Sequence, residues 1–354
     1  MSRHRPARPS RGARFASVAA VAVPSALAGL VTAAGARPAA AQEGIVGTLV
    51  VVNKGEATLT VIDAASGTIR GRVPTGRGPH EVVLTGDGAT AIVTDYGVET
   101  GGSTLTIVDV AGLRVARTVD LGRHTRPHGV SVMPGDELVA VTSEASGHVV
   151  LVRIADGEIA AEIPTGHPGS HMLAMVGDGE TIYTSNMGDA TVGELDVAGG
   201  ELVRSVGVPA RPEAIGVTND GSEVWVGSNE QGTVSVVRPG TSEVETALAG
   251  FEWPYRILFT PDRRLVLIPD LGRNELRIVD RVSREELARL EFPGARPQGI
   301  TLDDDASHAF LSLADEGRMV VIDLERREVV RSIDTGPTPD GVAFTTRVFP
   351  VGAR

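Results

Sequence analysis

A short pattern that returns seven times limits the possible folds of this 354-residue chain more than any other feature. Each copy has a small residue or proline, one variable residue, three or four apolar residues, a turn rich in Gly and Asp, and an apolar strand. Successive variable residues are 48, 43, 42, 42, 43 and 42 positions apart. A period in the low forties is typical of β-propeller blades, whereas solenoid repeats are shorter or helical. The variable residues are His80, His128, His171, Glu213, Tyr255, Gln298 and Asp340.

The seventh copy is incomplete, and its missing part lies at the other end of the chain. Residues 341–345 supply only a first strand, while Thr48–Asn53, Leu59–Asp63 and Ile69–Val73 match the second, third and fourth strands. Pairing these segments would close a ring and leave no exposed sheet edge. The sequence therefore predicts an all-β fold, a seven-bladed β-propeller of four-stranded antiparallel blades, closed by pairing the C-terminal strand with the N-terminal three strands.

The first 41 residues differ in character from the rest. Five arginines between Arg3 and Arg14 precede an apolar stretch from Phe15 to Thr32, and Ala39-Ala40-Ala41 offers small residues for cleavage. This order is typical of a secretory signal peptide. An uncleaved N-terminal anchor is the alternative, but Pro24 interrupts an apolar run that barely reaches spanning length. We expect a signal peptide at 1–41, a propeller at 42–354, and a periplasmic or extracellular protein.

Composition excludes several classes of function. Removing residues 1–41 leaves 27 basic and 45 acidic residues, a net charge of about −18, and Lys54 is the only lysine. Affinity for nucleic acid comes mostly from Lys and Arg, so we expect no nucleic-acid partner and no membrane span after cleavage. The chain has no cysteine, which excludes disulfides, thiolate metal sites and covalently attached haem. With no glycine-rich phosphate loop either, we expect neither haem nor a nucleotide as cofactor.

Three segments carry a family resemblance. They are TLVVVNKGEATLTVIDAASGTIRGRVPTG, RPHGVSVMPGDELVAVTSEASGHVVLV and RPEAIGVTNDGSEVWVGSNEQGTVSVV. These resemble the YVTN-repeat β-propeller family of exported bacterial proteins, over residues 47–346. The resemblance implies the fold. It does not imply one function, because this architecture hosts binding proteins, lyases, lactonases and metal-site domains.

The variable residues are the candidate site. The first strand of each propeller blade lines the central channel, so these seven residues should form a ring at one mouth. Three imidazoles from consecutive blades and a carboxylate suit a divalent transition metal, with His80, His128, His171 and Glu213 as ligands. Alternatively, the histidines simply fill a polar mouth and hydrogen-bond water or carbonyls. The full set of predicted ligand-binding residues is His80, Glu81, His128, Glu144, His171, Glu213, Tyr255, Arg256, Gln298 and Asp340.

Residues next to this ring have two interpretations each. Residues fifteen positions after the variable ones, such as Asp95 and Asn186, should lie beside the same mouth. Arg256 could bind a substrate carboxylate or phosphate, or pair with an acid such as Glu213. Glu81 could act as a general base or orient an imidazole, unless strand alternation turns it between the blades.

Further candidates come from loops. Trp253 offers a stacking face for an organic ligand, or simply packs. The Tyr96–Thr104 loop has four more residues than its equivalents, and the next inter-blade loop holds His124. Both loops should lie on the histidine face, where the longer one predicts a flap over the mouth.

Three functions fit these observations. The first is an exported binding protein whose mouth holds a divalent metal, a small ligand or another envelope protein. The second is a metal-assisted hydrolase or lyase of the lactonase or streptogramin-lyase type, in which a His or Glu acts as acid or base. The third is a protein-interaction scaffold with no active site. We expect a monomer.

Overall fold

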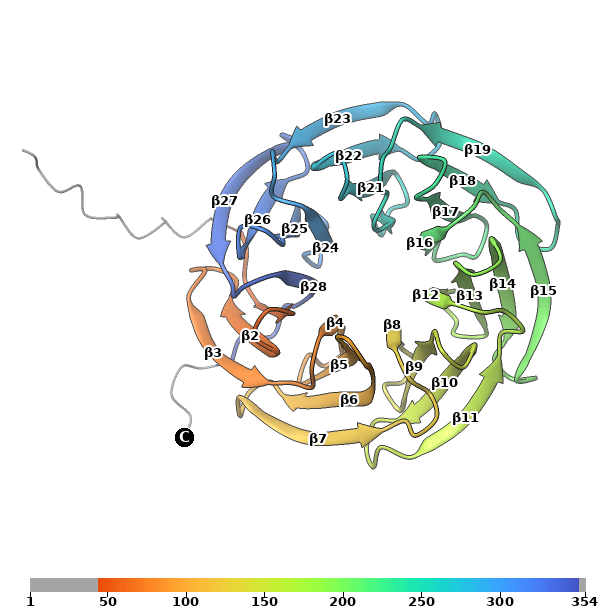
Figure 1. Cartoon of the computed structure of the whole chain (residues 1–354). Coiled ribbons are helices and arrows are strands. Elements are labelled where there is room, and N and C mark those ends of the chain that lie inside the picture. The colour runs from red at the N-terminus through yellow and green to blue at the C-terminus, as the bar shows by residue number, and fades with distance from the viewer. Residues whose placement is uncertain (1–43, 350–354) are drawn as a thin grey trace, which may run out of the picture. The chain divides into compact units, whose positions relative to one another are not determined.

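The computed structural model describes residues 44–349, and within this range it contains 28 strands and no helix. The strands form seven four-stranded antiparallel sheets arranged as blades around a central channel (Figure 1). Residues 1–41, the expected signal peptide, lie outside the described range. No helix in 44–349 has the length and apolarity needed to cross a membrane.

Six blades are continuous in sequence and the seventh is shared by the two ends of the propeller. The strands are β1 (Thr48–Asn53), β2 (Thr58–Asp63), β3 (Ile69–Pro74), β4 (Pro79–Leu84), β5 (Thr90–Gly97), β6 (Gly101–Asp109), β7 (Arg114–Asp120), β8 (Pro127–Val132), β9 (Leu138–Ser143), β10 (His148–Arg153), β11 (Ile159–Pro164), β12 (Ser170–Met175), β13 (Thr181–Asn186), β14 (Thr191–Asp196), β15 (Glu201–Gly207), β16 (Pro212–Val217), β17 (Val224–Ser228), β18 (Thr233–Val237), β19 (Val244–Ala249), β20 (Leu258–Phe259), β21 (Leu265–Asp270), β22 (Glu275–Asp280), β23 (Glu286–Glu291), β24 (Pro297–Leu302), β25 (His308–Leu313), β26 (Arg318–Asp323), β27 (Glu328–Asp334) and β28 (Pro339–Thr345).

The predicted closure is confirmed. β28 pairs antiparallel with β1, Thr345 opposite Thr48 and Val342 opposite Val51, in a sheet of order β28-β1-β2-β3. Figure 1 shows the two ends of the colour scale side by side in this blade. Hydrogen bonds between β28 and β1 therefore hold the ring closed.

Burial falls from the inside of each blade to the outside, as the sequence predicts. Every residue of β1 and β25 is buried, because these second strands lie between neighbouring blades. The fourth strands, such as β7 and β11, form the rim of the propeller, and most of their residues are exposed. Apolar clusters between adjacent blades form the core, so each blade is stabilised by both of its neighbours.

Glycine residues and a threonine hydroxyl allow the first strands of neighbouring blades to pack closely against each other. A Cβ on Gly129 would lie 2.6 Å from the backbone nitrogen of Leu173, and a Cβ on Gly341 would lie 2.7 Å from the carbonyl oxygen of His80. The hydroxyl of Thr142 accepts from the Gly129 N–H and donates to the His171 carbonyl at 2.6 Å. These contacts bring neighbouring first strands, and the side chains they carry, close together at the channel.

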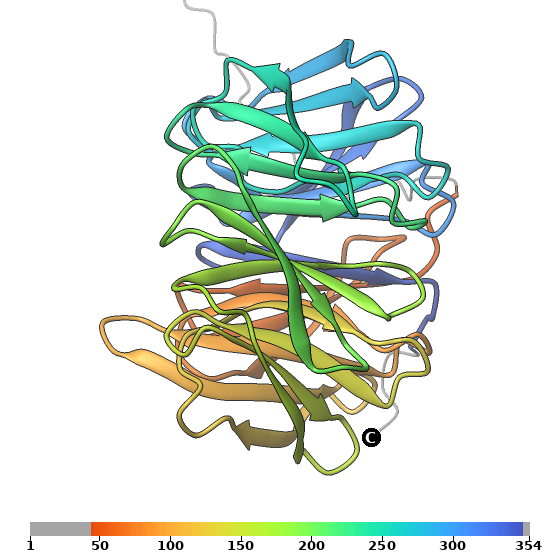
Figure 2. The same ribbon diagram turned by 90° about the vertical axis from the view of Figure 1, so that its right-hand side faces the viewer.

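The long loop of the first complete blade is not a separate flap. Its residues extend the β5–β6 hairpin, with Gly97 opposite Gly101, and leave only a short exposed tip around Val98. Figure 2 shows this orange hairpin reaching beyond the other loops on its side of the ring. Tyr96, at the base of the tip, points its hydroxyl at Glu144. The insertion therefore contributes a side chain to the mouth.

Candidate functional site

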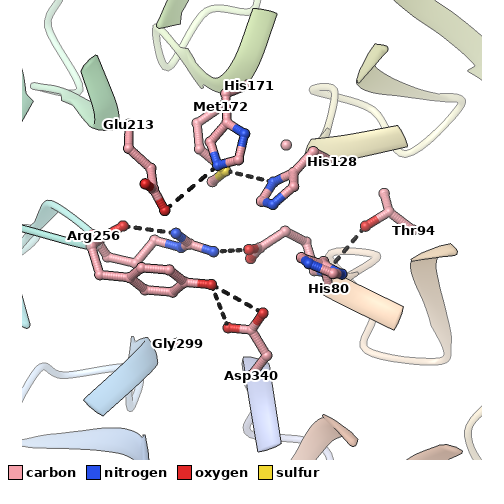
Figure 3. A network of polar contacts seen from close by, with 12 residues as sticks. His80, Thr94, His128, His171, Met172, Glu213, Arg256, Gly299 and Asp340 are labelled. Atoms are coloured by element: carbon pink, nitrogen blue, oxygen red, sulfur yellow. Dashed lines mark hydrogen bonds and ion pairs between the residues drawn. The ribbon is translucent and has the colours of Figure 1, made fainter. Parts of the chain in front are cut away.

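Five of the variable residues lie around one mouth of the channel (Figure 3), namely His80, His128, His171, Glu213 and Asp340. Six of the seven first strands, all except β20, carry a register shift at their start, for example between Pro79 and Val82 in β4 and between Ser170 and Leu173 in β12. Such a bulge interrupts the strict alternation of side chains between the two sides of a strand. Both the variable residue and the residue after it can therefore reach the channel. Glu81, Met172 and Arg256 occupy this second position.

A second ring comes from the ends of the second strands, one residue beyond the predicted position. Asp95 lies opposite Pro79 as expected, but its carboxylate accepts hydrogen bonds from Gly76 N–H, Thr104 and Thr106 and so holds the blade's own loops. Asp95 therefore lies beside the ring and supports the loops of its own blade. In four blades the next residue makes contacts with the ring or with its neighbours, namely Lys54, Tyr96, Glu144 and Asn229.

Three histidine rings stand in a row across adjacent blades. The ring centroids of His80 and His128 are 4.9 Å apart, and those of His128 and His171 are 3.9 Å apart. His128 is 2% exposed and His171 is 9% exposed. Glu144 joins the row through a hydrogen bond to His171 Nδ1. Single ligand atoms of His128, Glu144 and His171 all lie within 4.8 Å of one another, so this group could hold a metal ion.

His80 and His171 each have one ring nitrogen without a hydrogen-bond partner within residues 44–349. His80 Nδ1 is 2.9 Å from the carbonyl oxygen of Gly78 and must donate to it, so a neutral ring leaves the lone pair on Nε2. The buried Nε2 of His171 has no hydrogen-bond partner among the described residues, and the nearest carboxylate, on Glu213, is 3.7 Å away. A buried polar atom without a hydrogen-bond partner destabilises the fold, so this nitrogen indicates a partner that is not part of the protein chain.

Glu213 is held in place from the other side. Its Oε2 accepts hydrogen bonds from the indole Nε1 of Trp253 at 2.9 Å and from the amide of Asn229. Trp253 is thus a positioning residue of the mouth, which neither of its predicted roles anticipated. With both donors on Oε2, the Oε1 atom faces His171.

The opposite half of the mouth is a chain of ion pairs. Lys54 Nζ lies 2.9 Å from Oδ2 of the fully buried Asp340, whose two oxygens accept from the Tyr255 hydroxyl at 3.2 Å. Arg256 stacks on the Tyr255 ring, 4.0 Å from its centroid, and pairs with Glu81. Of the two roles predicted for Arg256, the structure shows pairing with an acid, and the acid is Glu81 instead of Glu213 because the bulge turns Glu81 inward.

The remaining predicted residues lie at the edges of this network. Gln298 is 5% exposed, and its Oε1 has no hydrogen-bond partner within 44–349. His124 does not reach the mouth. It is buried beneath the rim, with Nδ1 2.8 Å from Ser146 Oγ and Nε2 3.2 Å from Glu162.

Burial and ion pairing give neighbouring histidines different protonation states. Burial lowers the pKa of His80 to about 4 and holds the pKa of His128 well below its usual value. Burial also disfavours charge on His171, but Glu144 and Glu213 outweigh it and raise its pKa to about 9. Burial raises the pKa of the Glu144 and Glu213 carboxyl groups. The interactions with the His171 cation outweigh burial, so both pKa values lie below the usual glutamate value. Near pH 7 the row therefore holds two neutral imidazoles and one imidazolium.

This arrangement predicts a pH dependence of stability for metal-free protein. The pKa of His171 in the folded protein, about 9, exceeds the ordinary histidine value of 6.5. Its contribution is therefore fully present below pH 6.5 and is lost as the pH rises through 9, a difference of roughly 1–3 kcal/mol. We expect His171→Gln to remove this loss, measured by urea unfolding at pH 6 and pH 9.5 after dialysis against EDTA. Parallel pH profiles of wild type and variant would contradict the assignment.

Comparisons with known proteins support the fold. No protein-family model matches the chain, so the resemblance to YVTN-repeat proteins stays a resemblance. The chain is similar to Protein NirF of Stutzerimonas stutzeri, with 24% identity over 346 residues, covering 90% of this chain and 86% of NirF.

Solved structures show the same architecture. Kuenenia stuttgartiensis hydrazine synthase matches with a TM-score of 0.68 at 18% identity, over 78% of this chain and 92% of that one. A functionally unknown protein from Desulfotomaculum acetoxidans matches with a TM-score of 0.70 at 16% identity, over 84% and 98%. Dihydro-heme d1 dehydrogenase NirN in complex with DHE matches with a TM-score of 0.59 at 16% identity, over 84% and 75%. At these identities the similarity shows the fold, and the fold is that of a β-propeller.

Proposed function

We propose that this chain is an exported propeller that binds a divalent transition metal at the mouth of its channel. The observation that carries the proposal is the His128–Glu144–His171 group, whose ligand atoms lie within 4.8 Å of one another. Two imidazoles and a carboxylate suit zinc, copper, nickel or manganese, and three protein ligands leave a position open for water or another ligand. The partnerless Nε2 of His171 and the free lone pair of His80 add donors beside the group.

The group of three shares two members with the predicted set of four, His80, His128, His171 and Glu213. His128 and His171 belong to both sets, Glu144 replaces Glu213 as the carboxylate, and His80 stands next to the group. Glu213 faces His171 and fits the role of a neighbour that orients a ligand and raises its basicity.

Charge favours a cation over an anionic ligand. With His171 neutral, as ligation requires, the four carboxylates of the mouth exceed its two permanent cations. Burial raises the pKa of Glu81 to about 7, so near pH 7 the excess is between one and two negative charges, and it falls by one when Arg126, stacked on Tyr96 at the rim, is counted. A divalent ion would compensate this excess where bulk water cannot reach. The groups concerned are Glu81, Glu144, Glu213, Asp340, Lys54 and Arg256.

Two alternatives use the same mouth. A metal-assisted hydrolase or lyase would need a base beside the ion, and neutral His80 with its Nε2 lone pair is the residue that favours this function. Because NirN was solved in complex with DHE, a haem-type ligand is the organic alternative, and titration with haemin followed by its absorption spectrum would detect it. In both alternatives, a small molecule or another envelope protein would occupy the open position beside the three protein ligands.

The metal site predicts a large effect of His128→Ala. Protein beginning at Gln42, without an affinity tag, is dialysed against EDTA, reconstituted with zinc, copper, nickel or manganese and desalted. We expect wild type to retain about one ion per chain and His128→Ala to retain less than about a tenth of that, because the variant loses the central ligand. Elemental analysis is the measurement.

His148→Ala is the matched control. His148 lies near His124 with Nδ1 2.7 Å from the Ser146 carbonyl oxygen, outside the group, so its removal should leave the ion in place. Both variants should melt as cooperatively as wild type, since the blades hold the ring together. A wild-type protein that retains none of the four metals, or a His128→Ala variant that retains its ion, would overturn the proposal.

A further inference from the structure

We propose that copper is the metal this site selects, with Met172 as the selecting ligand; this inference rests on the proposed metal-binding function. The Met172 sulfur lies 3.1 Å from Nδ1 of His128, inside the row of histidines (Figure 3). Met172 is 9% exposed. The group therefore offers a sulfur donor in addition to nitrogen and oxygen.

The bulge in β12 is what brings the thioether to this position. In a regular strand Met172 would face away from its neighbour His171, but the register of β12 with β13 shifts between Ser170 and Leu173. In the other blades the same repeat position holds glycine or alanine, or one of the two residues of the Glu81–Arg256 ion pair. Met172 is thus the one residue of this position within 44–349 that brings sulfur to the mouth. The small residues at this position are Gly129, Ala214, Gly299 and Gly341.

A hydrogen bond alone gives little reason for the sulfur to lie here. A thioether is a weak acceptor, and a buried imidazole N–H is better satisfied by a carbonyl, as at His80. A neutral, polarisable thioether is a good ligand for Cu(I), and it adds little for zinc, manganese or nickel. The chain has no cysteine, so methionine is its only soft ligand type.

The same group suits both oxidation states of copper. Cu(I) prefers the sulfur and the imidazoles, while Cu(II) prefers the imidazoles and a carboxylate. Met172, His128 and Glu144 supply all three ligand types around one point. The inference is therefore a copper site whose affinity for Cu(I), unlike its affinity for zinc, depends on Met172.

The test compares Met172→Leu with wild type, both beginning at Gln42 and free of metal. Leucine conserves volume, so the fold should persist. Cu(I) is titrated without oxygen against a chromogenic chelator, and zinc is titrated in the same way. We expect Met172→Leu to bind Cu(I) at least about tenfold more weakly, which is the loss of one good ligand, and to bind zinc as wild type does. Met175→Leu, three residues along the same strand, should change neither affinity.

X-ray absorption at the copper edge gives a second measurement that needs no variant. We expect a sulfur scatterer in the Cu(I) form of wild type and its absence in Met172→Leu. If zinc binds but the spectrum shows no sulfur, or Cu(I) affinity is equal in both proteins, the copper inference is wrong and the metal site stands. If neither zinc nor copper binds, the proposed function is wrong and the copper inference with it.

Discussion

Ending the chain at Asp340 should abolish the single sharp thermal transition of this protein. The deletion removes β28 from Gly341 onward, and with it the strand that pairs with β1. It also exposes the inner edge of the buried strand β1 and removes Phe344, whose ring stacks on Phe310 with centroids 5.5 Å apart. The expected loss is comparable to the whole free energy of unfolding of a domain, about 5–15 kcal/mol, because an open ring loses the cooperation between its first and last blades.

A second truncation separates this effect from the loss of chain length. Ending the chain at Phe349 keeps β28 and the buried Phe349 side chain, so the protein should melt like the full chain. Calorimetry and far-UV circular dichroism are the measurements. A protein ending at Asp340 that melts in one transition near the wild-type temperature would show that β28 does not close the ring in solution.

Arg256→Met should be the most destabilising single substitution at the mouth. The guanidinium is buried, pairs with Glu81, donates to the Tyr255 carbonyl at 2.7 Å and stacks on the Tyr255 ring. Removing it leaves the Glu81 carboxylate buried without its cation. Breaking one side of a buried ion pair costs about 3–5 kcal/mol, which urea unfolding of the metal-free protein would measure.

The double variant identifies the cause of that loss. Adding Glu81→Gln to Arg256→Met removes the uncompensated charge, so the double variant should recover more than half of the lost stability. Arg273→Met is the control, because Arg273 is exposed, and its effect should stay within about 0.5 kcal/mol. If the double variant is no more stable than Arg256→Met, packing against Tyr255, and not charge, is what Arg256 contributes.

The predicted strands correspond closely to the observed ones because the repeat carries their signals locally. Alternation of apolar runs with Gly and Asp turns is read within one blade, and the period fixes which residues are equivalent. The strands predicted at Leu59–Asp63 and Ile69–Val73, for instance, lie within β2 and β3. Equivalence alone then placed His80, His128 and His171 at one mouth, since equivalent positions in a ring lie at the same height.

The partners within the mouth could not be derived in this way. Strict alternation turns Glu81 away from the channel, whereas the bulge turns it toward Arg256, 175 residues along the chain. The same departure brings Met172 to His128. A bulge belongs to the pairing of two strands and is not visible in either strand's sequence.

The sequence by itself determined the number of blades, the closure of the ring and the face that carries the histidines. Only the tertiary structure decided that Glu144 joins His128 and His171, and that Lys54 pairs with Asp340 across 286 positions of the chain. The physical reason is that a repeat specifies positions along each strand, whereas the contacts of a charged side chain depend on which neighbour the closed ring brings within reach and on the burial that makes an unpaired charge costly.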